Sequence, residues 1–258
     1  MRRSISFTIL FFVMLSVLVS CYQSHKKELD LAYTLAESKP DSALAFLNRI
    51  NQGKLSDKDM AKYALTYYMA QDKSGLDVDN DSLIRIAYDW YGEHQDDSLY
   101  ATTLYYMGKY FLLNDSMEQA KACLEKSYSI SDSLHNMNLK CLALDKLIEV
   151  EEQLAPDTAL KYAKALVKMY DSMPNVTIYN KVAARLRLCD NFMFVDSLRQ
   201  ALCEGQIALK QVIKDADRNL YSFVCQDLAN VYEKVGEKDS CLFYARQAYG
   251  INGTDRLS

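Results

Sequence analysis

The stretch between residues 100 and 130 constrains the fold more than any other part of the chain. It holds two segments with helical periodicity, separated by the short polar break Asn114-Asp115-Ser116. Small residues at Gly108 and Ala120 interrupt the large apolar ones, and small residues allow two helices to cross closely. Only 8 Gly and 3 Pro occur in 258 residues, too few for an all-β chain with many tight turns. The sequence therefore predicts an all-α protein.

The same stretch resembles the tetratricopeptide repeat (TPR), a helix–turn–helix unit of about 34 residues. The residues that match its packing positions are Leu104, Met107, Gly108, Phe111, Ala120, Leu124 and Ser127. The resemblance implies a right-handed α-α superhelix, a TPR-like solenoid of about six helical hairpins. A solenoid of another helical repeat type is the alternative, because several hairpins match the TPR pattern only loosely.

An Asp-Ser or Asp-Thr pair recurs along the chain at intervals of 34 to 43 residues. The pairs are Asp41-Ser42, Asp81-Ser82, Asp115-Ser116, Asp157-Thr158, Asp196-Ser197 and Asp239-Ser240. Because Asp is a favourable N-cap and suits the positive end of the helix dipole, we expect each pair to start the second helix of a hairpin. The hairpins predicted in this way cover about residues 26–51, 56–93, 96–132, 137–172, 175–214 and 217–251.

The N-terminus has the pattern of a targeting segment. Arg2 and Arg3 precede the apolar run Ile5–Val19, which is short for a membrane span of about 20 residues. The run ends in Leu-Val-Ser-Cys, which resembles a bacterial lipobox with Cys21 as the lipidated residue. We therefore expect a lipoprotein signal peptide (1–20), a lipid-anchored tether (21–25) and a TPR-like helical repeat domain (26–258). An ordinary secretory signal or an uncleaved anchor is the alternative.

The residues after Cys21 bear on the location of the protein. Enteric lipoproteins retained in the inner membrane carry an Asp after the lipidated Cys, whereas Tyr22 follows here. By this resemblance we expect a protein lipid-anchored to the cell envelope, facing the periplasm from the outer membrane. Helix starts such as Asp-Ser-Ala-Leu at 41–44 also resemble TPR lipoproteins of Bacteroidetes type.

No motif in the sequence predicts catalysis. HExxH, GxSxG, P-loop and GxGxxG patterns are absent, and His25, His94 and His135 lie near helix ends or in the tether. The acids between Glu149 and Glu152 could suggest acid–base chemistry. Asp77-x-Asp79-x-Asp81 begins like a calcium loop but lacks the later Gly and Glu. We expect solvated surface residues in each case, and no catalytic residue, metal site or cofactor; the chain is not predicted to be an enzyme.

Six cysteines remain besides Cys21, namely Cys123, Cys141, Cys189, Cys203, Cys225 and Cys241. No CxxC pattern occurs, so zinc and thioredoxin-like chemistry are not expected. All six lie in helical patterns, where a free thiol serves as a small buried apolar group. Disulfides stay open as the alternative, because the number is even and the expected compartment is oxidising.

The predicted function is that of a membrane-anchored periplasmic scaffold that binds a protein or peptide partner. Stacked hairpins present their first helices along a concave groove. The template places these residues in that groove: Thr102, Tyr105, Lys109, Leu112, Phe223, Gln226, Asn230 and Glu233. A net charge of −4 without a basic cluster argues against binding to nucleic acid.

Two other functions stay open. One is an envelope-assembly accessory lipoprotein, of the outer-membrane barrel-assembly or pilotin kind, which shares only size, lipid and repeats with this chain. The other is the ligand-binding half of a sensor or regulator. Some Bacteroidetes-type relatives continue past the repeats into a transmembrane helix and a cytoplasmic DNA-binding or signalling region.

The last predicted helix, about Asp239 to Ile251, has a second apolar face. Leu242 and Tyr249 are seven residues apart and Phe243 lies beside them. The end of a solenoid offers apolar surface unless it is capped, and bare apolar patches usually mark interaction sites. We therefore expect a second copy of the chain or a partner protein to cover this C-terminal face.

A final pattern concerns modification. Asp-Ser or Asp-Thr followed by an apolar residue resembles the O-glycan acceptor motif of exported Bacteroidetes proteins. It occurs at Ser42, Ser82, Ser98, Ser116, Ser133, Thr158, Ser172 and Ser197. Helix capping is the alternative explanation for most of these pairs.

Overall fold

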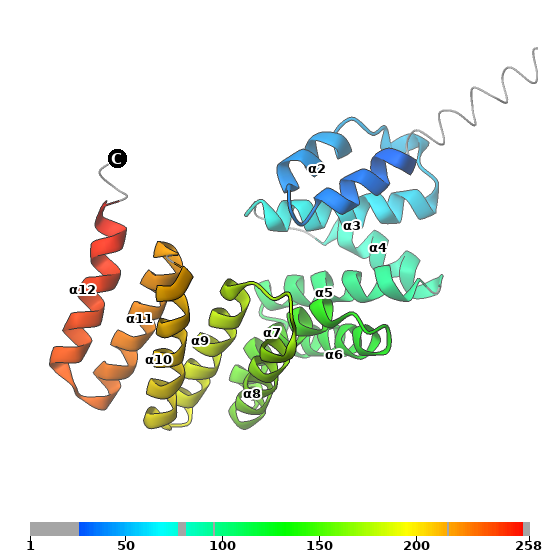
Figure 1. Cartoon of the computed structure of the whole chain (residues 1–258). Helices are drawn as coiled ribbons and strands as arrows, with labels where there is room; N and C mark the ends of the chain where they lie inside the picture. The colour runs from blue at the N-terminus through cyan, green and yellow to red at the C-terminus, as the bar shows by residue number, and fades with distance from the viewer. Residues whose placement is uncertain (1–25, 77–80, 95, 216, 255–258) are drawn as a thin grey trace, which may run out of the picture. The chain divides into compact units, whose positions relative to one another are not determined.

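The computed structural model describes residues 26–76, 81–94, 96–215 and 217–254 (Figure 1). The described residues form helices and connecting turns, without any β-strand. The chain divides into two compact units, Met1–Ser116 and Met117–Ser258, called here the N-terminal and C-terminal units. The boundary falls in the turn of the stretch 100–130, so its two helices belong to different units.

The N-terminal unit is a series of short and medium helices. They are the helical residues 26–35, α2 (Pro40–Leu47), the 3-10 turn η1 (Gln52–Lys54), α3 (Asp57–Lys73), α4 (Ser82–Glu93) and α5 (Asp97–Leu113). Each of α3, α4 and α5 contacts the helix before it. Leu29, Leu47, Ile50 and Tyr63 form a buried cluster that joins the first helices.

Tyrosines supply much of this unit's remaining core. The rings of Tyr68 and Tyr106 meet edge-on with centroids 5.9 Å apart, and those of Tyr105 and Tyr106 with centroids 5.0 Å apart. Burial raises the pKa of Tyr68, Tyr91 and Tyr106, so their hydroxyl groups stay neutral. The high tyrosine content of the chain thus has a packing role here.

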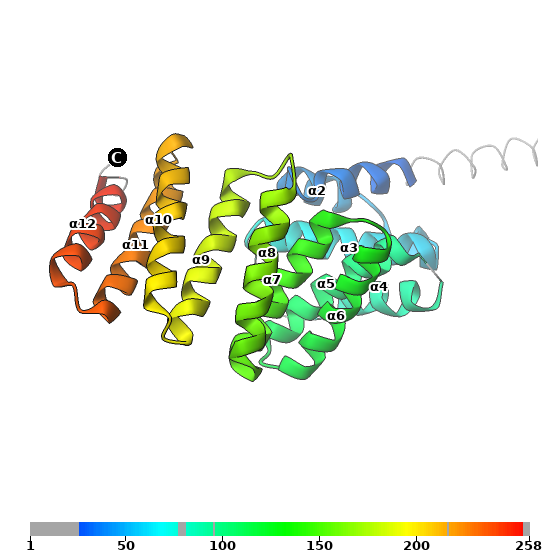
Figure 2. The same cartoon turned by 60° about the horizontal axis from the view of Figure 1, so that its bottom comes forward.

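The C-terminal unit continues the alternation with longer helices. These are α6 (Met117–Ser133), α7 (Met137–Leu154), α8 (Pro156–Ser172), α9 (Ile178–Phe194), α10 (Leu198–Asp215), α11 (Arg218–Val235) and α12 (Lys238–Thr254). Every helix contacts the next one, and Figures 1 and 2 show α9 to α12 side by side in chain order. α11 also contacts α9, which places the first helices of successive hairpins next to each other.

Two clusters of buried side chains hold this unit together. One joins α7, α8 and α9 through residues such as Leu144, Ile148, Leu166 and Leu188. The other joins α9, α10 and α11 and includes Leu228. Where α10 meets α11, a Cβ added to Gly205 would lie 2.7 Å from Cδ2 of Leu228. Only glycine fits there without displacing that side chain, so the small residue sets how closely the two helices approach.

The helix ends correct one prediction about the Asp-Ser and Asp-Thr pairs. Asp41 and Asp157 lie inside the first turns of α2 and α8, and Asp81 precedes α4 without a side-chain capping bond. Asp115 and Asp196 have φ values of 54° and 56°, in the left-handed region. The pairs do lie at the starts of the second helices, as predicted. The prediction that the Asp serves as the N-cap there is wrong.

Asp115 and Asp196 instead end the helices that precede them. The N–H of Ser116 donates to the carbonyl of Phe111, and that of Ser197 donates to the carbonyl of Phe192. This is the Schellman pattern, in which a left-handed residue closes the last helical turn. The side chains that cap helices lie elsewhere, on the first helices of the second to sixth hairpins: Ser56, Asp96, Asn136, Thr177 and Asp217.

The packing positions of the stretch 100–130 agree with the predicted template. Leu104, Met107, Gly108, Ala120, Leu124 and Ser127 are buried, and Phe111 is half-buried. The all-α, TPR-like fold is therefore confirmed, whereas the right-handed twist of the superhelix stays a prediction. The predicted domain boundaries at residues 20 and 25 lie outside the described residues.

The six cysteines beyond residue 100 are free thiols. Cys123, Cys141, Cys189 and Cys225 are buried, Cys241 is half-buried and Cys203 is exposed. The four buried ones agree with a packing role. No helix of the described ranges combines the length and apolar character that a membrane span needs.

Candidate binding site on helices α7, α9 and α11

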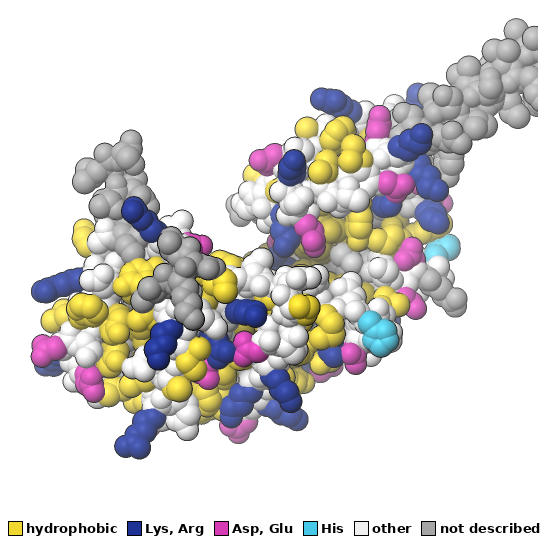
Figure 3. All heavy atoms as spheres, in the orientation of Figure 1, with side chains coloured by type: hydrophobic (Ala, Val, Ile, Leu, Met, Phe, Trp, Pro, Cys, Tyr) yellow, Lys and Arg dark blue, Asp and Glu magenta, His cyan; other side chains and the backbone are white. Residues whose placement is uncertain are grey.

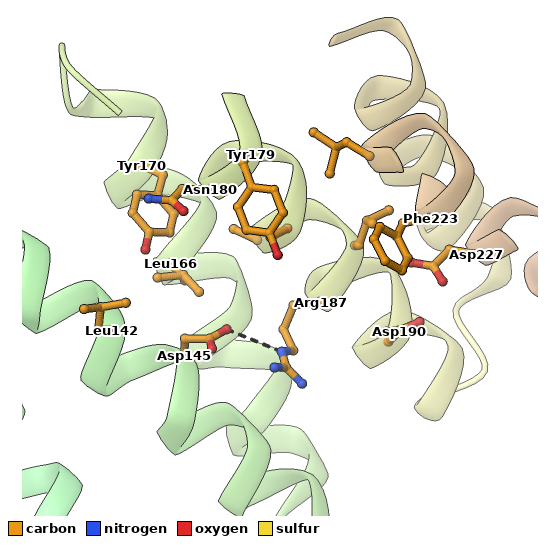
Figure 4. Close-up of a pocket in the computed structure, with 14 residues that line it drawn as sticks. Leu142, Asp145, Leu166, Tyr170, Tyr179, Asn180, Arg187, Asp190, Phe223 and Asp227 are labelled. Atoms are coloured by element: carbon orange, nitrogen blue, oxygen red, sulfur yellow. Dashed lines mark ion pairs between the residues drawn. The ribbon is translucent and has the colours of Figure 1, made fainter. Parts of the chain in front are cut away.

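The first helices of the last three hairpins line a cavity of about 420 Å³ in the C-terminal unit (Figure 4). α7 contributes Asp145, α9 contributes Arg187 and Asp190, and α11 contributes Phe223 and Asp227. Residues three or four apart share one face of a helix, which explains why each helix presents these groups together. Apolar side chains, among them leucines from all three helices, form the remaining wall.

Arg187 is held by carboxylates of α7. Its Nε lies 3.5 Å from Asp145 Oδ1, its Nη1 3.7 Å from Glu152 Oε2, and its Nη2 3.9 Å from Glu149 Oε2. Figure 4 shows the guanidinium reaching toward Asp145. Asn191 donates a further hydrogen bond of 2.7 Å to Glu152. The charge of Arg187 is therefore already shared among three acids.

Asp190 and Asp227 lie in the same cavity without such a partner. Among the described residues, neither carboxylate has a hydrogen bond or an ion pair. Burial raises the pKa of Asp190 to about 6, although Arg187 and Lys234 act in the opposite direction. Burial, and then the charge of Asp190, raises the pKa of Asp227 to about 7. Both carboxyl groups are consequently poised to gain or lose a proton near neutral pH.

Aromatic rings flank these charges. Tyr179 and Phe223 are 59% and 62% exposed although both line the cavity, whereas Tyr170 is buried in its wall. Figure 4 shows Phe223 beside Asp227 at one end of the cavity and Tyr170 at the other. Tyr179 belongs to the first turn of α9, which Thr177 caps by accepting a bond from the N–H of Asn180. Exposed rings on a well-anchored helix end offer contact surface at a low entropic cost.

A second, smaller cavity of about 240 Å³ adjoins the same charges. It shares Arg187 and Asp190 with the first cavity and adds Glu152, Phe194 and Lys234. Phe194 is 65% exposed, so this cavity also has an accessible aromatic ring. The two cavities together extend along α9 from Tyr179 to Phe194 and along α11 from Leu220 to Lys234.

The predicted groove residues of α11 only partly coincide with this site. Phe223 lines the cavity. Gln226, Asn230 and Glu233 are exposed, and Gln226 donates a 3.1 Å hydrogen bond to Asn230. Whether these three bind a partner stays a prediction.

The predicted groove residues on α5 are more buried than those on α11. Tyr105 is only 5% exposed because its ring packs against Tyr106, so its assignment as an accessible groove residue is wrong. Thr102, Lys109 and Leu112 are half-buried, and Lys109 forms an ion pair with Asp72.

The sequence analysis missed α7 and α9 as carriers of the site. A signal was present, because Asp145, Glu149 and Glu152 follow helical spacing and share one face of α7. Glu151, which was grouped with them, points elsewhere: it is 1% exposed and pairs with Lys121 of α6 at 2.7 Å. Helical direction, rather than proximity in sequence, decides which of these acids meet.

The other candidate residues give no catalytic arrangement in the described part of the chain. His94 is exposed and stacks on Trp90 with ring centroids 3.7 Å apart, and His135 is exposed in a turn. No group of three His, Cys, Asp or Glu among the described residues is placed to hold a metal ion. His25, Cys21, Asp77 and Asp79 lie outside the described residues.

The remaining predicted surface sites are accessible to different degrees. Leu242, Phe243 and Tyr249 of α12 are 54%, 55% and 79% exposed, and Figure 3 shows hydrophobic side chains between charged ones over α10 to α12. Of the proposed O-glycan acceptors, Ser116, Thr158 and Ser197 are half-buried and the other five are exposed. Neither interaction nor modification is tested by this exposure.

Comparison with known proteins identifies the fold. No protein-family profile and no curated protein matches the sequence. The apo form of RapI matches with a TM-score of 0.73 and 12% identity over 90% of this chain, which spans 66% of RapI. The TPR-like repeats of a Podosopora anserina putative kinesin light chain match with a TM-score of 0.59 and 10% identity, over 90% of this chain and 96% of theirs.

A Rap protein complexed with Competence and Sporulation Factor matches with a TM-score of 0.59 and 9% identity, over 90% of this chain and 77% of that one. The fold is TPR-like. At these identities the likeness extends to the fold alone.

Proposed function

We propose that this protein is a scaffold that binds a segment of a protein partner on α7, α9 and α11. The observation that carries the proposal is the cavity of about 420 Å³ between these helices, with exposed rings of Tyr179 and Phe223 at its rim. Ligand sites in helical stacks are concave, mostly apolar, and carry a few polar groups that fix orientation. The arrangement contains no nucleophile–base pair, which favours binding over catalysis.

Two further points belong to the same proposal. Structural neighbours include a Rap protein in complex with Competence and Sporulation Factor. This neighbour is an example of a similar fold that binds another molecule. Lipidation at Cys21 would tether the scaffold to the cell envelope, where it faces the periplasm and meets its partner there. Attachment can be checked directly, because Cys21→Ala should abolish incorporation of labelled fatty acid and release the protein from membranes.

Site-directed photo-crosslinking tests the binding surface. A photoreactive phenylalanine analogue placed at Tyr179 or Phe223 should give a discrete cross-linked species in intact cells. The same analogue at Lys210, an exposed position on α10, serves as the control. Adducts at 179 and 223 but not at 210 would support the proposal. Equal adducts at all three positions, or none at 179 and 223, would contradict it.

A second surface supports self-association or a further protein contact. Leu242, Phe243 and Tyr249 of α12 expose more than half of their side-chain surface. Covering such residues removes apolar area from water, which favours association. We expect the Leu242→Glu, Tyr249→Glu double variant to reduce any dimer seen by light scattering, without loss of helix content. A monomer before mutation, with no co-purifying partner, would exclude this contact.

A further inference from the structure

The cavity on α7, α9 and α11 has an excess of negative charge that the protein itself does not neutralise. Four acidic and two basic side chains line the two adjoining cavities, an excess of two negative charges when all are ionised. Arg187 is engaged by the three acids of α7. Asp190 and Asp227 are left without an ion-pair partner among the described residues. Both residues are half-buried, and a carboxylate that is partly withdrawn from water is stabilised by a nearby cation.

The geometry points to a lysine or arginine side chain of the partner as the group that completes this site, with its cation between Asp190 and Asp227. This inference rests on the proposed scaffold function and names the chemistry of the bound segment. The alkyl stem of such a side chain would lie along the ring of Phe223, which Figure 4 shows beside Asp227. A cation near an aromatic face gains further attraction.

Charge complementarity selects this occupant over the alternatives. An acidic segment would meet carboxylates from three helices and be repelled. A purely apolar segment would cover Tyr179 and Phe223 but would take the half-buried Asp190 and Asp227 further from water without giving them a partner. A basic side chain supplies both the apolar stem and the charge, so it satisfies both parts of the cavity.

The affinity of the cavity for a cation should depend on pH, because Asp190 and Asp227 can be protonated. The charged or titratable groups that face the two aspartates are Arg187 and Cys189 of α9, Glu152 of α7 and Lys234 of α11. The pKa of Asp190 is about 6 and that of Asp227 about 7, so both are largely protonated at pH 5 and largely ionised at pH 8. A cation binds the ionised pair better, and affinity should therefore rise between pH 5 and pH 8.

Synthetic hexapeptide pools, each with one fixed residue, provide the probe. We expect pools with fixed Arg or Lys to bind the intact protein about tenfold more tightly than pools with fixed Gln, Leu or Glu. The best Arg peptide is then remade with citrulline, a neutral analogue of the same shape. Affinities of the two peptides are measured at pH 5 and pH 8 by isothermal titration calorimetry.

Variants assign the effect to the cavity. Asp190→Asn and Asp227→Asn should remove both the preference for Arg over citrulline and its pH dependence, while the citrulline peptide keeps its affinity. Asp239→Asn, which removes an exposed acid on α12 outside both cavities, should leave both unchanged. Retained affinity for the citrulline peptide also shows that the aspartate variants are folded.

The outcomes separate this inference from the scaffold function. If Arg and citrulline peptides bind equally, the scaffold function stands and the cation site is wrong. If no pool binds and positions 179 and 223 give no cross-links, both are wrong. If spermidine alone binds as tightly as the Arg peptide, the cavity takes a free amine and the inferred protein segment is excluded.

Discussion

The N-terminal and C-terminal units differ in how they bury polar groups. In the described part of the N-terminal unit, ion pairs join one base to one acid, as in Arg85 with Asp81 and Lys109 with Asp72. Its buried polar groups are mostly hydroxyls, those of Thr66 and Thr103 and of several tyrosines. In the C-terminal unit, by contrast, Arg187 meets three carboxylates and Arg185 meets Asp171 and Glu204.

The polar groups of the N-terminal unit serve packing, whereas some of those in the C-terminal unit are better explained by binding. Buried tyrosines stay neutral because burial raises their pKa further above 10, so the N-terminal core gains nothing and loses nothing by titration near neutral pH. The unpaired carboxyls of Asp190 and Asp227 cost stability whenever they ionise. Costly groups of this kind concentrate at functional sites, which is why the C-terminal unit is the better candidate for binding.

The largest expected loss of stability comes from removing Arg187, the cation that three carboxylates of α7 share. Arg187→Met leaves Asp145, Glu149 and Glu152 facing one another, and we expect a loss of about 1–3 kcal/mol in unfolding free energy. The matched change Arg85→Met removes a pair whose basic side chain is 53% exposed, and it should cost under about 1 kcal/mol.

Each unit carries its own reporter for this measurement. Trp90, the single tryptophan, lies in the N-terminal unit, and the six described cysteines lie in the C-terminal unit. Urea unfolding followed by tryptophan fluorescence, and by mass-spectrometric mapping of thiol labelling, therefore reads the two units separately. Equal losses of unfolding free energy in the Arg187→Met and Arg85→Met variants would show that the two units do not differ in this way.

A smaller effect should depend on pH. The pKa of Asp227 rises from 3.8 to about 7 on folding, so its stabilising contribution is complete below about pH 4 and is lost as pH rises through 7. Asp227→Asn removes that loss and should raise stability at pH 8 by on the order of 1–2 kcal/mol, with no gain at pH 4. Glu233→Gln is the exposed control on the same helix. A gain at pH 4 as large as that at pH 8 would rule out this cause.

The smallest effect should be the same in both units. Asp115 and Asp196 hold left-handed φ values that glycine adopts without strain, so Asp→Gly at either position should stabilise by about 0.5–1 kcal/mol. Gly236 has a φ of 85° in the equivalent turn after α11, and Gly236→Ala should destabilise by about 1 kcal/mol. Thermal unfolding monitored by circular dichroism is sufficient. Unequal gains at 115 and 196 would show that the two turns are not equivalent.

The positions of the helices could be predicted from the sequence because each helix is specified by residues that are close together in the chain. Apolar spacing placed each hairpin within a few residues, and small residues such as Gly108 and Ala120 marked buried packing positions. The Asp-Ser pairs were located correctly, but their Asp was wrongly predicted to be an N-cap, because Asp also tolerates the left-handed conformation that ends a helix. Only the backbone angles at Asp115 and Asp196 distinguish that role from capping.

The site was harder to predict because it depends on how helices distant in sequence face one another. The hairpins of α7 and α9 match the repeat loosely, so the template did not position their inward faces. Arg187 meets Glu149 from a separate helix, and no periodicity within one helix encodes that meeting. The unpaired state of Asp190 and Asp227 likewise follows from three helices at once.

The most direct test of this account is a carbon-13 NMR titration of the aspartate carboxyl groups, with Asp190→Asn and Asp227→Asn used for assignment. We expect two carboxyls with apparent pKa values near 6 and 7, each absent from the spectrum of its own variant. Addition of an arginine-containing peptide should lower both values, because a bound cation favours the ionised forms. Titration of both groups near pH 4 in the free protein would contradict the unpaired, half-buried carboxyls on which the proposed site depends.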